Sequence, residues 1–174
     1  VENRKLILGG VDIPYEKGLL GHSDADVLIH AIVDALLGSV AFGDIGEKFP
    51  DTEEKWKGAD STKLLSQVVS MLSADGWCVG NVDATIIAER PKIRPMVDAI
   101  RVSLSRLLGV EIDRVSVKGK TNEKMDDVGS SVGIVCHAAV LVFKNKKDKQ
   151  YELLNQMDQF MCCPSYRRYP GTGG

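Results

Sequence analysis

The sequence predicts a two-layer α/β (α+β) domain, with a mixed sheet of four or more strands and helices on one face. Strand-like and helix-like segments alternate up to about Lys144, which is typical of two packed layers. The 174 residues correspond to about one domain, and 44% of them are hydrophobic, which is enough for a core. We therefore expect one domain over 1–144. The charged segment 145–174 has no apolar periodicity, and we expect it to be a mobile tail.

The composition argues against several classes of protein. Twenty-two Lys and Arg residues against 24 Asp and Glu give a formal charge of −2, so we expect no nucleic-acid partner. No apolar run approaches the ~20 residues that span a bilayer, so we expect no membrane segment. The four cysteines match no C-x-x-C or zinc-finger spacing, and we interpret them as free thiols in a reducing compartment.

The N-terminal part predicts one strand and one buried helix. The short apolar run Leu6–Leu8 precedes a pair of glycines and predicts a strand, and Val11–Lys17 is expected to be a loop. A helix is expected from Ala25 to Leu37, with Ser23 or Asp24 as its N-cap. Because this helix is apolar on nearly every face, it should be buried.

Two amphipathic helices and three more strands complete the predicted domain. The helices are expected over Ser61–Ala74 and Pro95–Leu108, and the strands over Val82–Ala88, Val115–Lys118 and Ile134–Phe143. The long apolar run of the last strand predicts that both of its faces are covered. The segment Gly43–Thr52 is rich in Gly and Pro, and we expect no regular structure in it.

The strongest cluster of polar residues is H-S-D-A-D-V-L-I-H, which begins at His22 and ends at His30 inside the first helix. Neutral imidazole is a good zinc ligand, and nearby carboxylates can orient it. The alternative is a core histidine, because Asp26 and Asp34 lie one turn before and after His30 and could satisfy its ring. The spacing alone leaves both interpretations open.

Three other motifs suit a phosphorylated ligand. G-D-I-G places Asp44 near two glycines, where backbone amides and a carboxylate can meet sugar-like hydroxyl groups. Arg90, Lys92 and Arg94 are cations at alternate positions, which could bind phosphate. V-K-G-K-T-N-E-K combines lysines and a hydroxyl with Glu123, a set that suits a metal-bridged phosphate. For each motif an ordinary solvated loop is the alternative.

Together and in this order, these segments resemble one family, the 2-C-methyl-D-erythritol 2,4-cyclodiphosphate synthases of the non-mevalonate isoprenoid pathway. The matching text is L-I-L-G-G-V-D-I-P-Y-E-K-G-L-L-G-H-S-D-A-D-V-L-I-H-A-I-V-D-A-L-L-G, then G-D-I-G-E-K-F-P-D-T, G-N-V-D-A-T-I-I-A-E-R-P-K and K-T-N-E-K. The resemblance covers about Lys5 to Lys144, and its long first block is highly specific.

The resemblance implies a lyase that acts on 4-diphosphocytidyl-2-C-methyl-D-erythritol 2-phosphate. The 2-phosphate oxygen attacks the β-phosphorus, closes a ring and expels CMP, so positioning and charge neutralisation should dominate catalysis. The resemblance also implies Zn²⁺, or a similar transition metal, on the β-phosphate, and Mg²⁺ or Mn²⁺ bridging the α- and β-phosphates. The implied assembly is a homotrimer with active sites between subunits and with each sheet facing the threefold axis.

The family's site residues carry over by position. His30 matches the helical zinc ligand and Glu123 the magnesium ligand, while His22 and Thr121 match catalytic groups that contact phosphate. The other matching positions would bind substrate: Ser23 at the phosphate; Asp44, Ile45 and Gly46 at the methylerythritol hydroxyls; Phe49, Pro50, Asp51, Thr52 and Glu53 in a loop above them; Ala88, Glu89, Arg90, Pro91, Lys92, Ile93 and Arg94 around cytidine and diphosphate; and Lys120, Asn122 and Glu123 beside the phosphates.

Two features depart from the family pattern. The family begins with a strand ending in Asp-x-His, which completes the zinc site, whereas this sequence opens after that strand; we expect a missing segment rather than a truncated, inactive form. Gly129–Gly133 replaces the G-R-G-E-G of bacterial members, which argues against an anion site built from that arginine. The nearby K-M-D-D-V-G is more like plastid and apicomplexan members. We therefore expect the plastid stroma, with bacterial cytoplasm as the alternative, and we expect His137 near the trimer axis.

Two other functions are compatible with the motifs. One is a non-catalytic trimer that binds cytidine nucleotides without a complete zinc site. The other is a generic metal-dependent phosphohydrolase, which would release inorganic phosphate in place of CMP.

Overall fold

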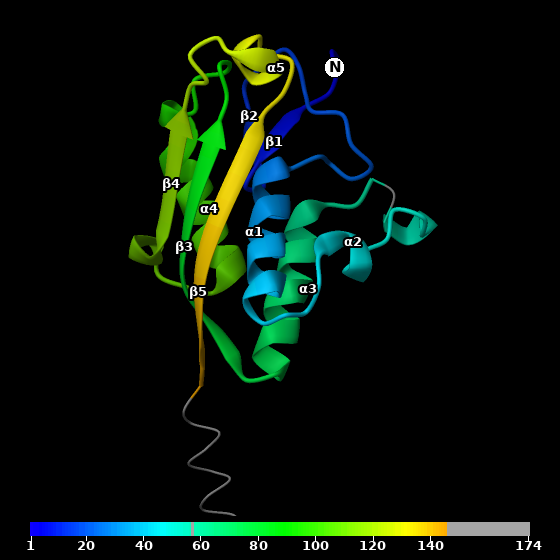
Figure 1. Cartoon of the computed structure of the whole chain (residues 1–174), viewed down its shortest axis with the longest axis vertical. Helices are drawn as coiled ribbons and strands as arrows, with labels where there is room; N and C mark the ends of the chain where they lie inside the picture. The colour runs from blue at the N-terminus through cyan, green and yellow to red at the C-terminus, as the bar shows by residue number, and fades with distance from the viewer. Residues whose placement is uncertain (57, 146–174) are drawn as a thin grey trace, which may run out of the picture. The chain divides into compact units, whose positions relative to one another are not determined.

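The structure is a computed structural model that describes residues 1–56 and 58–145 of the chain. One compact unit, Val1–Phe143, contains nearly all of the described helices and strands (Figure 1). A second unit, Lys144–Gly174, is described only at its first two residues. The expected tail over 145–174 therefore lies almost entirely outside the described residues.

A three-stranded sheet forms one layer of the first unit. Its strands lie in the order β4 (Val115–Lys120), β3 (Trp77–Ile87) and β5 (Val135–Lys144). Strands β3 and β4 are parallel, with Val82 opposite Val115, and β5 runs in the opposite direction (Figure 1). The predicted mixed sheet is confirmed, but within the described residues it has three strands and not four or more.

The fourth predicted strand, Leu6–Leu8, belongs to a separate hairpin. As β1 it pairs antiparallel with β2 (Val11–Ile13), so part of the predicted loop 11–17 is a strand. Gly9 and Gly10 form the turn, and both have positive φ, at 64° and 73°. Two residues with positive φ make the tight turn that pairs adjacent strands, which is why β1 pairs within the hairpin.

Three helices form the second layer: α1 (Val27–Ser39), α3 (Ser61–Ala74) and α4 (Val97–Leu108). In Figure 1, α4 lies behind the sheet, and α1 and α3 lie side by side. Their apolar residues share one core with the inward face of β3, where Val82, Ala84 and Ile86 are fully buried. The expected combination of helices with a mixed sheet is therefore confirmed.

The helix boundaries follow the capping residues. The predicted helix Ser61–Ala74 is confirmed at both ends, and its N-cap Asp60 accepts the N–H of Thr62. Helix α1 begins two residues later than predicted, because Asp26 is its N-cap in place of Ser23 or Asp24. The N-terminal end of the third predicted helix is a 3₁₀ turn, Arg94–Met96 (η2), and β3 starts five residues earlier than expected.

The prediction of no regular structure in 43–52 is wrong in part. A single helical turn, α2 (Ile45–Lys48), lies there, and its N-cap Asp44 accepts the N–H of Glu47 at 2.8 Å. A short acid followed by one turn is enough to cap it. The remaining short elements are the 3₁₀ turns η1 (Glu54–Trp56) and η3 (Ile112–Arg114) and the turn α5 (Asp126–Gly129).

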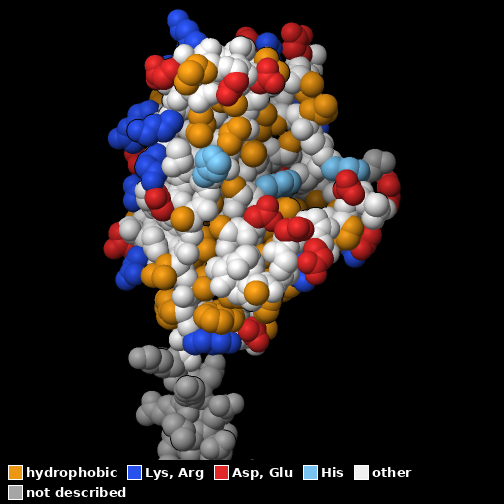
Figure 2. All heavy atoms as spheres, in the orientation of Figure 1, with side chains coloured by type: hydrophobic (Ala, Val, Ile, Leu, Met, Phe, Trp, Pro, Cys, Tyr) orange, Lys and Arg blue, Asp and Glu red, His pale blue; other side chains and the backbone are white. Residues whose placement is uncertain are grey.

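The described chain covers one face of strand β5 and leaves the other open, so it accounts for half of the prediction that both faces are covered. Cys136, Ala138, Val140 and Val142 pack against the core. The alternate residues face outward, and Leu141 and Phe143 are 60% and 51% exposed. Figure 2 shows hydrophobic side chains gathered on the face of the molecule where β5 lies. The apolar run thus reflects two apolar faces, of which the described chain covers one.

Among the described cysteines, Cys78 and Cys136 are free thiols, and burial raises the pKa of Cys136 to about 12. Cys162 and Cys163 lie outside the described residues. None of the helices in the described part of the chain combines the length and apolar composition that a membrane span needs.

A buried carboxylate joins the β1–β2 hairpin to α1. Asp26 is fully buried, and its oxygens accept three backbone N–H groups: from Gly9 and Ile29, each at 3.0 Å, and from Gly10 at 2.7 Å. Burial outweighs these hydrogen bonds and raises the pKa of Asp26 to about 6. The N-terminus of α1 is therefore fixed against the turn of the hairpin.

Asp26 should make the stability of the chain depend on pH. Its pKa is raised from 3.8, so the folded chain binds more protons than the unfolded chain between that pH and about pH 6. The free energy of unfolding should fall by roughly 2 to 3 kcal/mol as the pH rises through this range, and then level off. Urea denaturation at a fixed protein concentration measures this slope.

The Asp26→Asn variant is the matched control, because it cannot titrate. It should lose the slope, and it should be less stable at pH 7 by about 1 to 3 kcal/mol, since an amide accepts fewer of the three N–H groups. An unchanged slope in this variant would assign the pH dependence to other groups.

Candidate active site

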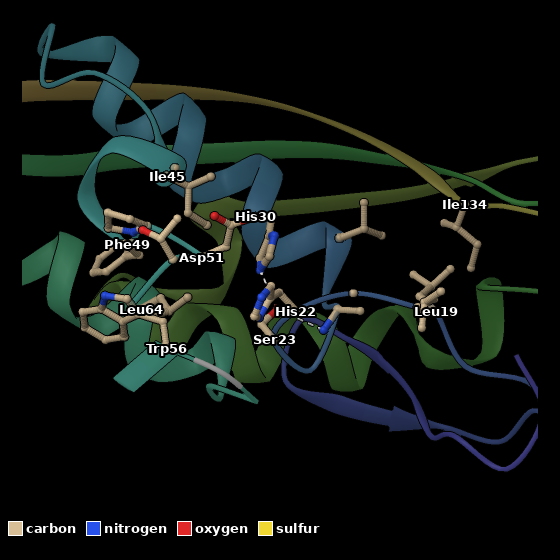
Figure 3. A pocket seen from close by; sticks show the side chains of 17 residues that line it. Leu19, His22, Ser23, His30, Ile45, Phe49, Asp51, Trp56, Leu64 and Ile134 are labelled. Carbon is tan, nitrogen blue, oxygen red and sulfur yellow. Dashed lines mark hydrogen bonds between the residues drawn. The ribbon is translucent and has the colours of Figure 1, made fainter. Parts of the chain in front are cut away.

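A pocket of about 560 Å³ opens beside the N-terminal end of α1 (Figure 3). One wall is formed by residues within 19–25, which precede the helix, and another by residues within 45–52, which include α2. His30 on α1 lies between these walls. Trp56, Leu64 and Ile134 also line the pocket, so residues that are far apart in the sequence meet there.

The ring of His30 contacts two serines. Its Nε2 lies 3.1 Å from Oγ of Ser61 and 3.2 Å from Oγ of Ser23. Burial lowers the pKa of His30, so the ring is neutral at pH 7. Neither Asp26 nor Asp34 satisfies this ring, because its hydrogen bonds in the described part of the chain are to Ser61 and Ser23.

The segment that carries His22 and Ser23 is held from two sides. The guanidinium of Arg4 donates to the carbonyl oxygen of Ser23, and the N–H of Gly58 donates to the carbonyl oxygen of His22 at 2.8 Å. Both histidines of the H-S-D-A-D-V-L-I-H motif line the pocket. The structure therefore brings this motif together as the sequence analysis expects.

Asp34 fixes the opposite wall to α1. Its Oδ1 accepts the N–H of Ile45, the first residue of α2, at 2.8 Å. Ile45 and Gly46 then line the pocket, whereas Asp44, the cap of the same turn, lies outside the lining. Asp26 and Asp34, one turn before and after His30 on α1, thus bind the neighbouring segments on either side of it.

An aromatic pair closes the pocket on the side of the 49–56 segment. The rings of Phe49 and Trp56 meet edge to face, with centroids 5.0 Å apart and an interplanar angle of 82°. Lys55 Nζ lies 4.8 Å from the centroid of the Trp56 ring. Within the described residues, the buried Nε1 of Trp56 has no hydrogen-bond partner. Sequence analysis missed Trp56, because it lies in a 3₁₀ turn that periodicity does not reveal.

The predicted nucleotide and phosphate residues form a second group at the carboxyl ends of β3 and β4. The N–H of Ala88 donates to the carbonyl of Lys120 at 2.9 Å, so the two segments lie side by side. Thr121 donates its hydroxyl to Oε1 of Glu123 at 2.6 Å. Arg90 lines a separate pocket of about 420 Å³ near this group.

The predicted site residues thus fall into two groups in one chain. The first pocket is lined by His22, Ser23, His30, Ile45, Gly46, Phe49, Pro50, Asp51 and Thr52. Asp44 and Glu53 flank this lining. The second group contains Ala88, Glu89, Arg90, Pro91, Lys92, Ile93, Arg94, Lys120, Thr121, Asn122 and Glu123, none of which lines the first pocket.

The described side chains do not form a complete metal site on their own. Across residues 1–56 and 58–145, no group of three or more His, Cys, Asp and Glu side chains is placed to hold a metal ion. A zinc site usually takes three or four protein ligands. His30 is a single donor, so the described residues supply only part of a zinc site, whereas one carboxylate such as Glu123 can hold Mg²⁺ together with substrate phosphates.

The profile of the YgbB family matches residues 1–143. The chain belongs to the YgbB family. A relative from Trichlorobacter lovleyi, named 2-C-methyl-D-erythritol 2,4-cyclodiphosphate synthase, is 60% identical over 82% of this chain and 90% of its own length. Other relatives with that name, at 50% identity or more, are also bacterial.

Two solved structures of enzymes are similar in fold to this chain. The bifunctional IspDF of Campylobacter jejuni has a TM-score of 0.80 and 36% identity, covering 83% of this chain and 39% of that longer one. A 2C-methyl-D-erythritol-2,4-cyclodiphosphate synthase with CDP bound has a TM-score of 0.76 and 36% identity, covering 82% and 93% of the two chains.

Removing the Asp34 carboxylate should loosen the wall of the pocket at α2. In Asp34→Ala the N–H of Ile45 loses its acceptor, so its hydrogen exchange should become roughly 2- to 10-fold faster, the effect of one hydrogen bond. Asp34→Asn keeps a carbonyl oxygen at that position and serves as the matched control. Equal exchange at Ile45 in all three proteins would show that this bond does not hold α2.

Proposed function

We propose that this chain converts 4-diphosphocytidyl-2-C-methyl-D-erythritol 2-phosphate to 2-C-methyl-D-erythritol 2,4-cyclodiphosphate and releases CMP, as a lyase of isoprenoid precursor biosynthesis. The observation that carries the proposal is the pocket at the start of α1, where His22, Ser23 and His30 meet the 45–52 segment. Identity of 60% with a relative named for this synthase supports the same reaction.

The reaction needs positioning more than it needs a base. The attacking oxygen belongs to a phosphate that is already anionic, so no residue has to remove a proton from it. Ser23 donates its hydroxyl to the substrate phosphate, and His22, beside it in the lining, polarises the reacting centre. The walls formed by Phe49 and Trp56 exclude water, which strengthens these polar interactions.

The sugar and nucleotide ends of the substrate go to different groups. One oxygen of Asp44 accepts the N–H of Glu47, which leaves its other oxygen for a methylerythritol hydroxyl, and the 49–53 loop covers that end. The nucleotide goes to 88–94, with Lys92 at the diphosphate, and Lys120, Thr121 and Asn122 lie beside the phosphates. The CDP-bound synthase of the same fold supports a nucleotide pocket in this family.

We assign the divalent metals to the same two groups. Zn²⁺, or a similar transition metal, would be held in part by His30, and Mg²⁺ or Mn²⁺ by Glu123. Such ions would neutralise charge on the diphosphate. Because each group supplies a single donor among the described residues, each ion would take further ligands from the substrate or from a second copy of the chain.

The assembly we propose is a homotrimer with its active sites between subunits. Two observations support it. The nucleotide group and the α1 pocket do not share a lining in one chain, so a second copy can complete each site. The open face of β5 also exposes Leu141 and Phe143, and exposed apolar patches commonly mark interfaces.

We propose the bacterial cytoplasm as the location. The relatives at 50 to 60% identity are bacterial, which supports this alternative. The plastid stroma, expected from the K-M-D-D-V-G stretch, has no support among those relatives.

The activity is tested by incubating the chain with its substrate, Zn²⁺ and Mg²⁺, and separating the products by chromatography. CMP and a cyclic diphosphate are expected. His30→Ala and Glu123→Ala should abolish turnover, and Ser23→Ala should lower kcat/KM roughly 10- to 100-fold, the loss of a hydrogen bond to a charged group. Ser66→Ala, exposed on α3, is the control and should keep full activity.

Three outcomes would contradict this function. Inorganic phosphate in place of CMP would indicate a phosphohydrolase. Binding of CDP in calorimetry without turnover would indicate a non-catalytic nucleotide-binding protein. Wild-type turnover in both His30→Ala and Glu123→Ala would show that the site is assigned wrongly.

The assembly is tested by sedimentation. A trimer of the 19.0 kDa chain has a mass of about 57 kDa. Replacing both Leu141 and Phe143 by Lys should shift the mass toward the monomer, since charges on an apolar interface cost more than they gain. Ile112→Lys changes an exposed residue away from β5 and should leave the mass unchanged. A monomeric wild-type chain would overturn the proposed assembly.

A further inference from the structure

Two residues outside the predicted site, Asp24 and Ser61, bind each other next to His30, and Ser61 contacts its ring. Ser61 is the first residue of α3 and is fully buried. Its N–H donates to Oδ2 of Asp24 at 3.0 Å, and its hydroxyl donates to Oδ1 at 2.5 Å. Both carboxylate oxygens are therefore bound to one serine, although the two residues are far apart in the sequence.

The hydroxyl of Ser61 has a single proton, and Asp24 takes it. A carboxylate accepts hydrogen bonds and has none to donate. Toward Nε2 of His30, 3.1 Å away, Ser61 Oγ therefore presents only lone pairs. Two lone pairs at that distance would repel each other, so the stable arrangement has a proton on Nε2. A neutral imidazole carries one proton, which leaves Nδ1 unprotonated.

Ser23 allows the same arrangement. Its Oγ accepts the N–H of Ala25 at 3.1 Å and lies 3.2 Å from Nε2 of His30. When Nε2 carries the proton it has no lone pair left, so the hydroxyl of Ser23 cannot donate to it. Among the described hydrogen bonds no other acceptor takes that hydroxyl proton. Ser23 and His30 both line the pocket, where Figure 3 shows the ring directed toward the serine.

We propose that Asp24 and Ser61 are positioning residues that fix His30 in the tautomer with its proton on Nε2, which leaves the Nδ1 lone pair and the Ser23 hydroxyl proton free for a ligand in the pocket. The catalytic benefit rests on the proposed function, because a free hydroxyl proton at Ser23 is what an anionic phosphate oxygen needs. The tautomer itself does not depend on that function.

The tautomer can be read directly from the ¹⁵N NMR signals of the imidazole rings. The chain has three histidines, so correlation of ring carbon-bound protons with ring nitrogens in uniformly labelled protein at pH 7, without added metal, gives few signals. His30→Gln identifies the signals of His30. The expected result is a protonated, pyrrole-type Nε2 and an unprotonated, pyridine-type Nδ1. The reverse assignment in the wild-type chain would overturn the proposal.

Variants test whether Asp24 and Ser61 are the cause. Ser61→Ala removes the oxygen that can only accept a hydrogen bond from Nε2 of His30. Ser23 can then either accept a hydrogen bond from Nε2 or donate one to it, so the Nε2 signal should move toward an average of the two tautomers. Asp24→Asn offers fewer acceptor sites to Ser61 and should move the signal in the same direction. Ser61→Thr keeps the hydroxyl and should retain the wild-type signal. Ser66→Ala, on the exposed face of the same helix, is the control for α3.

The outcomes separate this proposal from the proposed function. A pyrrole-type Nε2 whose ¹⁵N signal shifts in Ser61→Ala and not in Ser66→Ala supports the proposal that Asp24 and Ser61 fix the tautomer of His30, whether or not the chain releases CMP. An Nε2 signal that is the same in Ser61→Ala, Asp24→Asn and wild type would show that the two residues do not set the tautomer. That second result would overturn the proposal even in an active enzyme.

Discussion

The three hydrogen bonds to the carboxylate of Asp26 are the constraint on which the other parts of the pocket depend. They fix the N-terminus of α1 against the glycine turn of the β1–β2 hairpin. His30 and Asp34 follow at one and two helical turns, so they lie on the same side of α1. Once that helix is fixed, His30 takes its place between the walls, and Asp34 is in reach of Ile45. Burying a carboxylate is unfavourable, and the backbone N–H groups around Asp26 offset that cost only in part, since burial still raises its pKa.

Local patterns predicted those parts of the fold that depend on local interactions. The apolar spacing predicts the helix Ser61–Ala74 to the residue, and the structure adds Asp60 as its N-cap. The motif around His22 and His30 likewise lies in a single stretch. The two hydrogen bonds between Asp24 and Ser61 could not be predicted, because they join residues that are far apart in the sequence. The assignment of Leu6–Leu8 to the main sheet failed for a related reason, since the glycine turn favours the neighbouring strand.

Strand β5 shows why hydrophobic runs are ambiguous. A run of apolar residues indicates that both faces avoid water, but it does not say whether the same chain covers them. Cys136 and Val140 pack on the core of this chain, whereas Leu141 and Phe143 on the other face remain exposed. The two groups of predicted site residues are ambiguous in the same way. Sequence motifs indicate which residues act together, but they do not show whether those residues meet within one chain or between two copies.

Trp56 gives the pocket an optical reporter of its own. The chain has two tryptophans, and their surroundings differ. Trp56 lines the pocket, and its indole N–H has no partner among residues 1–56 and 58–145. The indole N–H of Trp77, the first residue of β3, donates to Asp75 outside that lining. Indole emission depends on the polarity and hydrogen bonding around the ring. A ligand entering the pocket would therefore change the fluorescence of one tryptophan, and the other would serve as an internal reference within the same unlabelled protein.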